Sequence, residues 1–333
     1  MVARLSTLLG ALGLAVAVPS FVLAPESAPA TASRTVEVDP DAAKTCGMCH
    51  TEFYEEWSHG LHAEAWTDPI YQESLKSKRK PQNCHGCHIP DDVHKRLGKK
   101  PKPRDSHLDE GVTCVSCHKS TASGDAIMGP FGAQTDAHPT AKNPAFTGAG
   151  SNHLCASCHD TKIRPVLPVA RDHKAYREAL GDKAKNCVEC HMPAVTRHLS
   201  VSMVTGKPVG EERETRRHKI LGPGDVEFLA KGFEMGARAA DGNVIVSIKN
   251  LAGHRIPGLT LREFHIAVRQ LGKGSDALSE DEIVLSHENV VQALETREFT
   301  FAHAEGATEV ELQFDHVLQG KVIATVITQK IGL

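Results

Sequence analysis

The stretch CGMCHTEFYEEWSHGLHAEAW, residues 46–66, gathers two cysteines and three histidines into one short segment. It opens with CGMCH and continues with His59 and His62, which lie between two tryptophans. Thiolate and imidazole groups are strong ligands for transition metals. So many ligand-capable side chains in so little sequence indicate a metal-containing cofactor.

The opening pentapeptide belongs to a pattern that recurs along the chain. Two cysteines separated by two residues and followed at once by histidine occur as CGMCH (46–50), CHGCH (84–88), CVSCH (114–118), CASCH (155–159) and CVECH (187–191). These motifs use all 10 cysteines. From the cysteine and histidine content, about 0.02 such pentapeptides are expected by chance, so five of them are a specific signal.

The spacing is that of covalent haem attachment, in which both thiols add to the vinyl groups of haem and the adjacent histidine binds the iron. Zinc ribbons also use such cysteine pairs but do not require a histidine after each pair, and a thioredoxin-type redox site uses a single pair. The sequence therefore predicts five covalently bound c-type haems with their iron. The predicted attachment residues are Cys46, Cys49, Cys84, Cys87, Cys114, Cys117, Cys155, Cys158, Cys187 and Cys190. The predicted proximal ligands are His50, His88, His118, His159 and His191.

Five haems attached within residues 46–191 leave little polypeptide to enclose each one, so neighbouring haems must nearly touch. Stacked porphyrins would supply much of the core, in agreement with an aromatic content of only 5%. The segment is rich in glycine and proline, which favours loops over long regular elements. We expect short helices after the attachment sites, at 51–66 and 174–184.

His62 is a candidate ligand for a haem other than the first. In a continuous helix, His50 and His62 would be about 18 Å apart along the axis, too far to share one iron unless the chain turns. His59 lies on roughly the same helical face, so only one of the two is needed as a ligand.

Several segments resemble multihaem c-type cytochromes related to the tetrahaem cytochrome that serves hydroxylamine oxidoreductase. WSHGLHAEAW resembles the W-x-x-S-x-H-A segment of that group, which selects His62 over His59 as a distal ligand. GPFGAQTDAH and RRHKILG resemble further segments, and the resemblance implies that His138 and His218 are distal ligands. NLAGHRIPG is similar to an element of the β domain that often follows, although it has PGL where PTG is usual, and this implies that His254 reaches back to a haem.

The fifth distal ligand is open between His94, His107 and His153, and His94 is ranked first. The alternative is that one iron keeps an open or water-filled position. Four histidines beyond the haem region are interpreted as ordinary residues of the β domain, namely His265, His287, His303 and His316.

The first 30 residues have the pattern of a secretory signal peptide, with a positive start, an apolar run and small residues before the cleavage region. Residues 31–43 would then form a tether. We expect a periplasmic or otherwise extracytoplasmic protein. The apolar run is also long enough for an N-terminal membrane anchor, which is the competing interpretation.

After about residue 225 the composition changes. Cysteine disappears, and the segments GNVIVSIKN, FHIAVRQL, ATEVELQF and KVIATVITQ show the alternation of half-buried strands. Asp241-Gly242 is a hairpin signal. The predicted fold is therefore α + β, with a loop-rich, mostly short-helical pentahaem domain at 44–224 packed around stacked haems and a small antiparallel β-sandwich at 225–333.

Charge gives limited information about partners. A formal net charge of -3 does not favour nucleic acid binding. Between Lys76 and Arg104, ten basic residues face only Asp91 and Asp92. This cluster is either a docking patch for an acidic redox partner or a solvated loop that also offsets haem propionates, and the solvated loop is the preferred interpretation.

These patterns favour an electron carrier that relays single electrons between a donor and an acceptor in a respiratory chain. A membrane quinol-oxidising complex is one candidate donor. A haem enzyme, such as a nitrite or hydroxylamine reductase with an open iron, is the alternative, although pentahaem nitrite reductases usually attach the catalytic haem through C-x-x-C-K. A structural subunit of a haem filament or outer-membrane conduit is a third interpretation and implies self-association.

Overall fold

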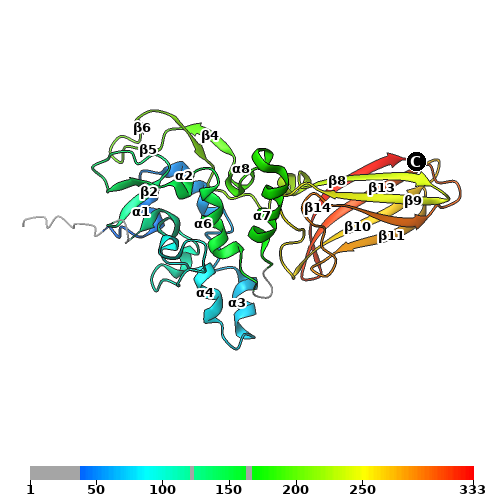
Figure 1. Ribbon diagram of the computed structural model, residues 1–333, viewed down its shortest axis with the longest axis horizontal. Helices are drawn as coiled ribbons and strands as arrows, with labels where there is room; N and C mark the ends of the chain where they lie inside the picture. The colour runs from blue at the N-terminus through cyan, green and yellow to red at the C-terminus, as the bar shows by residue number, and fades with distance from the viewer. Residues whose placement is uncertain (1–37, 121–123, 163–166) are drawn as a thin grey trace, which may run out of the picture. The chain divides into compact units, whose positions relative to one another are not determined.

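The computed structural model describes residues 38–120, 124–162 and 167–333 and has an α + β fold, as predicted. Residues Asp39–Leu333 form one compact unit. Figure 1 shows short helices, loops and small strands in the first part of the chain, and longer strands that run alongside one another in the last part. The predicted signal peptide and most of the predicted tether lie outside the described residues.

The helices of the motif-bearing part are short, in agreement with its content of glycine, proline and polar residues. They are α1 (Ala43–Gly47), α2 (Thr51–Ser58), α3 (Pro69–Lys76), α4 (Gln82–His88), α5 (Cys114–His118), α6 (Gly150–His159), α7 (Val169–Leu180), α8 (Cys187–His191) and α9 (Val226–Ala230). Single 3-10 turns are η1 (Val93–Arg96), η2 (Leu108–Glu110), η4 (Pro144–Phe146) and η5 (Gly181–Lys183).

Small sheets connect these helices. The first joins β1 (Lys119–Ser120), β2 (Ala126–Gly129) and β3 (Thr140–Lys142), with β2 and β3 parallel. Two antiparallel pairs follow, which are β4 (Ala194–Arg197) with β7 (Arg213–Arg216) and β5 (Ser200–Val201) with β6 (Pro208–Val209). These pairs fix the loop that leads from the fifth motif to His218.

The last part of the chain forms two antiparallel sheets, as expected from the strand patterns. One has the order β11-β10-β13-β14 and the other β12-β9-β8. Their bounds are β8 (Phe233–Ala240), β9 (Asn243–Asn250), β10 (Arg262–Leu271), β11 (Ala277–Leu285), β12 (Thr296–Ala302), β13 (Glu309–Leu318) and β14 (Lys321–Gly332). Asp241 and Gly242 connect β8 to β9 with positive φ angles of 49° and 73°, which is the geometry of a two-residue hairpin turn.

The main hydrophobic core of the described residues lies between these two sheets. Alternate residues of β9, β10 and β13 are fully buried, among them Val246, Ile266 and Phe314. By contrast, many of the buried apolar side chains in the motif-bearing part are alanines, for example Ala43 and Ala63. Side chains alone therefore supply a large core only in the β region.

Two predicted helices differ from the observed ones. The helix expected at 51–66 ends at Ser58, because the chain turns at Gly60, whose N–H bonds to the carbonyl of Trp57. The helix expected at 174–184 begins earlier and ends at Leu180 before a glycine with positive φ. Within the described residues, every helix is too short or too polar to span a bilayer.

Candidate haem-binding sites

Each motif contains one short helical segment, and this explains its local geometry. Four of the motif histidines are the last residues of their helices, namely those of α4, α5, α6 and α8. Cysteines three residues apart lie on the same face of a helix, so one rigid cofactor can bridge them. All ten cysteines are described, and none is in a disulfide.

Cysteines of different motifs lie in contact. The Cys46 thiol lies beside that of Cys114, and the Cys155 thiol lies beside that of Cys187. A third such contact joins Cys87 to Cys158. The first motif therefore lies beside the third, and the fourth lies beside both the second and the fifth. Attachment points this close require that the cofactors they hold are neighbours.

Four of the five motif histidines face a second histidine from a distant part of the sequence. The ring centroids are separated by 6.3 Å for His50 and His138, 6.3 Å for His62 and His159, 6.0 Å for His118 and His218, and 6.2 Å for His191 and His254. The partners are the four histidines that the resemblance implies to be distal ligands. The structure thus assigns each of them to one motif, which the sequence did not.

This spacing fits two imidazoles on opposite faces of one iron. A metal–imidazole bond is about 2.0 Å long and a ring nitrogen lies about 1.1 Å from its centroid, so two axial imidazoles have centroids about 6 Å apart. Side chains in direct van der Waals contact would be closer, at about 4 Å. The four pairs therefore match the geometry of bis-histidine haem ligation.

The hydrogen bonds of these rings prepare Nε2 as the ligand atom. A carbonyl oxygen can only accept, so an Nδ1 bonded to it carries the proton and leaves the lone pair on Nε2. Such bonds run from Nδ1 of His50 to Leu199 (2.7 Å), of His88 to Ala65 (2.5 Å), of His118 to Met128 (2.7 Å), of His191 to Leu221 (2.7 Å), of His218 to Arg216 (2.9 Å) and of His254 to Arg255 (2.9 Å). The neutral tautomer needed for metal binding is thus fixed by the backbone.

Burial of these rings also favours the neutral imidazole. It lowers the pKa of His62, His118 and His254 to about 4 each, with a smaller contribution from neighbouring histidines. It also lowers the pKa of His218. These imidazoles are neutral at pH 7 and can bind iron without first losing a proton.

The turn that replaces the end of the expected helix explains the position of His62. Its carbonyl accepts a hydrogen bond from Val112 N–H (2.8 Å), and Trp57 Nε1 donates to the Val112 carbonyl (2.9 Å). Gly111 has a φ of 56° and packs so closely on the His62 backbone that a Cβ would clash there. The residues before the third motif therefore hold His62 toward His159.

The remaining motif histidine, His88 of the second motif, has a different neighbour. Its ring is stacked on Tyr71 with centroids 3.6 Å apart and planes 7° from parallel. Tyr71 is buried, its hydroxyl has no hydrogen-bond partner among the described residues, and burial raises its pKa. Tyr71 was not identified from the sequence, which contains no motif around it.

The three histidines considered as the fifth distal ligand lie elsewhere. His94 was ranked first, but its Nε2 bonds to the Cys117 carbonyl (2.8 Å) and is not available to a metal. His107 Nε2 lies 2.9 Å from Asp39, and His153 is exposed. Within the described residues, none of these rings contacts His88. His59, the local alternative to His62, is also exposed, and its Nδ1 bonds to the Glu55 carbonyl (2.8 Å).

Two charged groups that the sequence did not single out hold distal histidines. Glu56 accepts the backbone N–H of His218 (2.7 Å) and bonds to the buried Arg197. Arg255, next to His254, makes a two-pronged ion pair with Asp172, with distances of 2.5 and 2.7 Å. In the sequence, only the position of Arg255 directly beside the candidate ligand His254 could have pointed to such a role, and this signal is weak.

The repeated attachment motifs and the four imidazole pairs are the arrangement expected of a multihaem c-type cytochrome. The comparisons with known proteins agree. The family described as "Cytochrome c554 and c-prime" matches residues 45–119. No curated protein is detectably similar to the chain in sequence.

Among solved structures, the chain is similar to a penta-haem cytochrome c552 from Thermochromatium tepidum. The TM-score is 0.64 at 18% identity, and the alignment covers 88% of this chain and 99% of that one. A glycosyl hydrolase family 2 member from Bacteroides cellulosilyticus aligns over 30% of this chain and 13% of its own, with 13% identity and a TM-score of 0.19. The first similarity supports the overall fold, whereas the second is too weak to indicate anything.

Proposed function

We propose that this chain is an exported cytochrome with five c-type haems that relays single electrons between redox partners in a respiratory chain. The observation that carries the proposal is the set of four imidazole pairs with centroids 6.0 to 6.3 Å apart. A covalently bound haem supplies one-electron chemistry through the ferric and ferrous states of its iron.

The residues of the chain would attach each haem, bind its iron and orient the ligand rings. The cysteines would hold each cofactor, the paired imidazoles would bind the iron of four of them, and the backbone carbonyls hold the rings in one tautomer. The attachment points lie close together, as Cys46 and Cys114 do. No acid or base is needed for such a relay.

Haem content and spin state test this proposal. Intact-mass measurement should give five haems per chain, and low-temperature electron paramagnetic resonance (EPR) of the oxidised protein should show four low-spin haems with two histidine ligands. A haem content well below five would overturn the pentahaem assignment. Mainly high-spin signals would overturn the relay.

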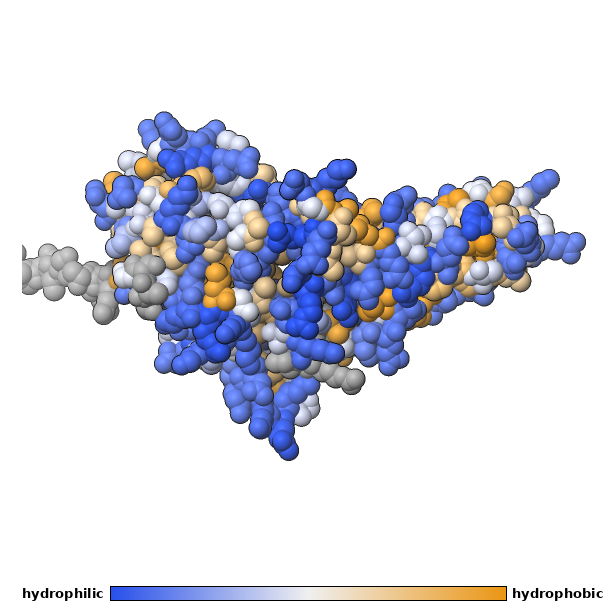
Figure 2. Space-filling view, in the orientation of Figure 1, coloured by the Kyte–Doolittle hydropathy of each residue, from blue (hydrophilic) through white to orange (hydrophobic). Residues whose placement is uncertain are grey.

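We also propose that an acidic redox protein docks on the turn between α3 and α4. Lys78, Arg79 and Lys80 are exposed there, just before the second motif, and they make no ion pair among the described residues. We call these three residues the basic turn, and Figure 2 shows hydrophilic residues covering this part of the surface. Complementary charge of this kind speeds encounter between partners.

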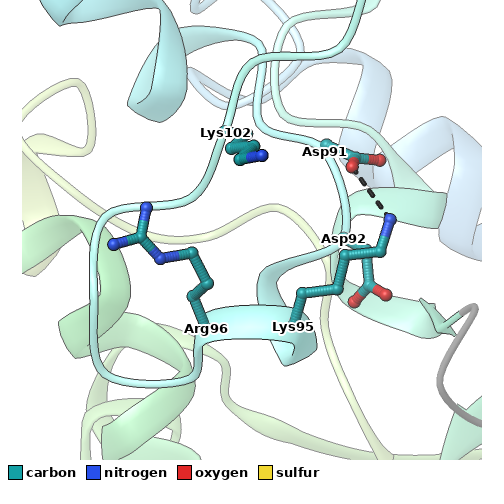
Figure 3. Close-up of a pocket in the computed structure, with 5 residues that line it drawn as sticks. All are labelled: Asp91, Asp92, Lys95, Arg96 and Lys102. Carbon is teal, nitrogen blue, oxygen red and sulfur yellow. Dashed lines mark hydrogen bonds and ion pairs between the residues drawn. The ribbon is translucent and has the colours of Figure 1, made fainter.

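Several other residues of the basic cluster have partners within the chain. Lys95 pairs with Asp91 at 3.1 Å beside Arg96 and Lys102, as Figure 3 shows. Arg104 donates to the carbonyls of Pro90 and His107, and burial lowers its pKa.

Charge removal at the basic turn tests the docking site. Changing Lys78, Arg79 and Lys80 to glutamine should slow electron transfer from a reduced acidic flavodoxin several-fold at low ionic strength. The same change at the exposed Lys231, Lys273 and Lys321 removes equal charge and should have little effect. Equal effects of both triple variants, or a rate insensitive to salt, would exclude the basic turn as the docking site.

A second candidate function follows from His88, whose ring stacks on Tyr71 and has no second histidine in ring contact among the described residues. An iron held only by His88 would keep one axial position for a substrate such as nitrite or hydroxylamine. High-spin EPR intensity of one haem, with an optical change when nitrite or hydroxylamine is added, would favour a reductase. Five low-spin haems that do not respond to either compound would exclude it.

A further inference from the structure

Glu56 lies at the centre of a charged network between the first and third haem motifs. It is on α2, the helix that starts directly after His50, and its carboxylate bonds to Arg197 at 2.9 and 3.0 Å. The same carboxylate accepts the N–H of His218 at 2.7 Å and pairs with Arg217 at 3.0 Å. The Glu56 side chain is only 14% exposed, so these contacts are shielded from water.

Arg197 connects this carboxylate to the strand that leads to His218. Its guanidinium is 5% exposed and donates to Thr215 Oγ1 (3.2 Å) and to the Arg216 carbonyl (3.1 Å), both on β7. His218 Nδ1 bonds to that same carbonyl. Arg197 therefore fixes the backbone atom that also orients the His218 ring.

Phe53 completes the arrangement. The Arg197 guanidinium lies 3.9 Å from its ring centroid, in the position of a cation–π contact. The same ring also packs against His218 in a T-shaped arrangement, with centroids 5.0 Å apart. Phe53 and Glu56 are three residues apart on α2 and so present both contacts from one helical face.

We propose that Glu56 and Arg197 are positioning residues that hold His218 as the distal ligand opposite His118. The inference rests on the proposed haem ligation by that pair. It adds that the ligand of the third motif is tied to the helix following the first motif, so that the relative position of two neighbouring haem sites is set by one ion-pair network.

Glu56→Gln tests this with a matched control. The variant loses the charge that balances the buried Arg197, and EPR should show the low-spin signal of one haem shifted or converted to high spin. Glu52→Gln is the control, because Glu52 lies on the same helix and contacts the same guanidinium at 3.4 Å, but its side chain is 67% exposed. All signals of the control should match those of the native protein.

The outcomes separate this inference from the proposed function. His218→Ala should convert one haem to high spin, and if it does not, ligation by His218 is wrong. If it does but Glu56→Gln keeps every native signal, or if Glu52→Gln has an equal effect, the positioning role is overturned while ligation stands. Should Glu56→Gln fail to assemble, Glu56→Asp keeps the charge but shortens the reach and should shift the same single signal. An unshifted Glu56→Asp spectrum would also overturn the role.

Discussion

The imidazole of His88 and the phenol ring of Tyr71 are stacked 3.6 Å apart, whereas every other motif histidine faces a second imidazole at 6.0 to 6.3 Å. Stacking of this kind contributes through buried area and ring contact, and not through the hydroxyl. The second motif thus has an environment of its own within the described part of the chain.

We expect the ring of Tyr71 to be important and its hydroxyl to be dispensable. The hydroxyl is buried without a partner among the described residues, so Tyr71→Phe should be neutral or stabilising by about 1 kcal/mol. Tyr71→Ala should lower the free energy of unfolding by about 3–5 kcal/mol through loss of the buried ring. Thermal unfolding followed by circular dichroism would measure both. A clear loss of stability in Tyr71→Phe would show that the hydroxyl has a partner after all.

His62 and His59 give the sharpest test of a distal ligand. His62 faces His159, so His62→Ala should convert one haem to high spin and leave the haem content unchanged. His59 is exposed and bonds to its own helix, so His59→Ala should keep the native EPR spectrum. The reverse pattern would show that the histidine selected by the resemblance is the wrong one.

A feature of this fold could be predicted from the sequence where neighbouring residues determine it. The motifs and the strands with regular alternation could be predicted because the chemistry and the burial are local. The strands β11 and β12 were not predicted, since β11 (ALSEDEIVL) carries three consecutive exposed acidic residues in its middle, and in β12 (TREFTFA) one of the three half-buried positions is an arginine. Ligand pairs such as His50 with His138 could not be assigned, because they depend on the packing of distant segments.

His94 is a candidate ligand that the sequence ranked first but that the structure engages elsewhere. His94, His107 and His153 all lie close to haem motifs, and no decisive sequence feature placed His94 first. In the structure its Nε2 is engaged by the Cys117 carbonyl. Whether a histidine can bind iron depends on which ring nitrogen is already bonded, and this is decided by the tertiary structure.

A pH dependence is expected in the β region. Burial lowers the pKa of His265, but hydrogen bonds to Glu263 (3.1 Å) and Glu282 (2.9 Å) outweigh it and raise the pKa above its ordinary value. The protonated ring therefore stabilises the fold fully below the unfolded pKa of about 6.5, and this stabilisation is lost as the pH rises through the folded pKa.

His265→Gln should thus be less stable than the native protein at about pH 5.5 and equally stable at about pH 9, with a difference of up to ~1 kcal/mol because both glutamates are partly solvated. His287→Gln is the control, since His287 has only a 3.7 Å contact with the exposed Glu288. Thermal melts at the two pH values would measure this. A difference for His265→Gln that persists at about pH 9 would contradict the assigned protonation.

The ion pair of Asp172 with Arg255 joins α7 to the loop that carries His254, so it should hold the β region's ligand opposite His191. The Asp172 side chain is only 11% exposed, and the hydrogen bond to it raises the pKa of Arg255. Asp172→Asn should cost about 1–3 kcal/mol, as expected for charged hydrogen bonds, and should disturb the EPR signal of one haem.

Glu178→Gln on the same helix removes an exposed pair with Lys174 (3.8 Å) and should cost less than about 0.5 kcal/mol without any spectral change. Unfolding and EPR of the two variants together separate the roles. If Asp172→Asn loses stability but keeps the native spectrum, the ion pair only supports the fold. If it also changes one haem signal, the β region completes a haem site, because its own loop supplies and orients the ligand.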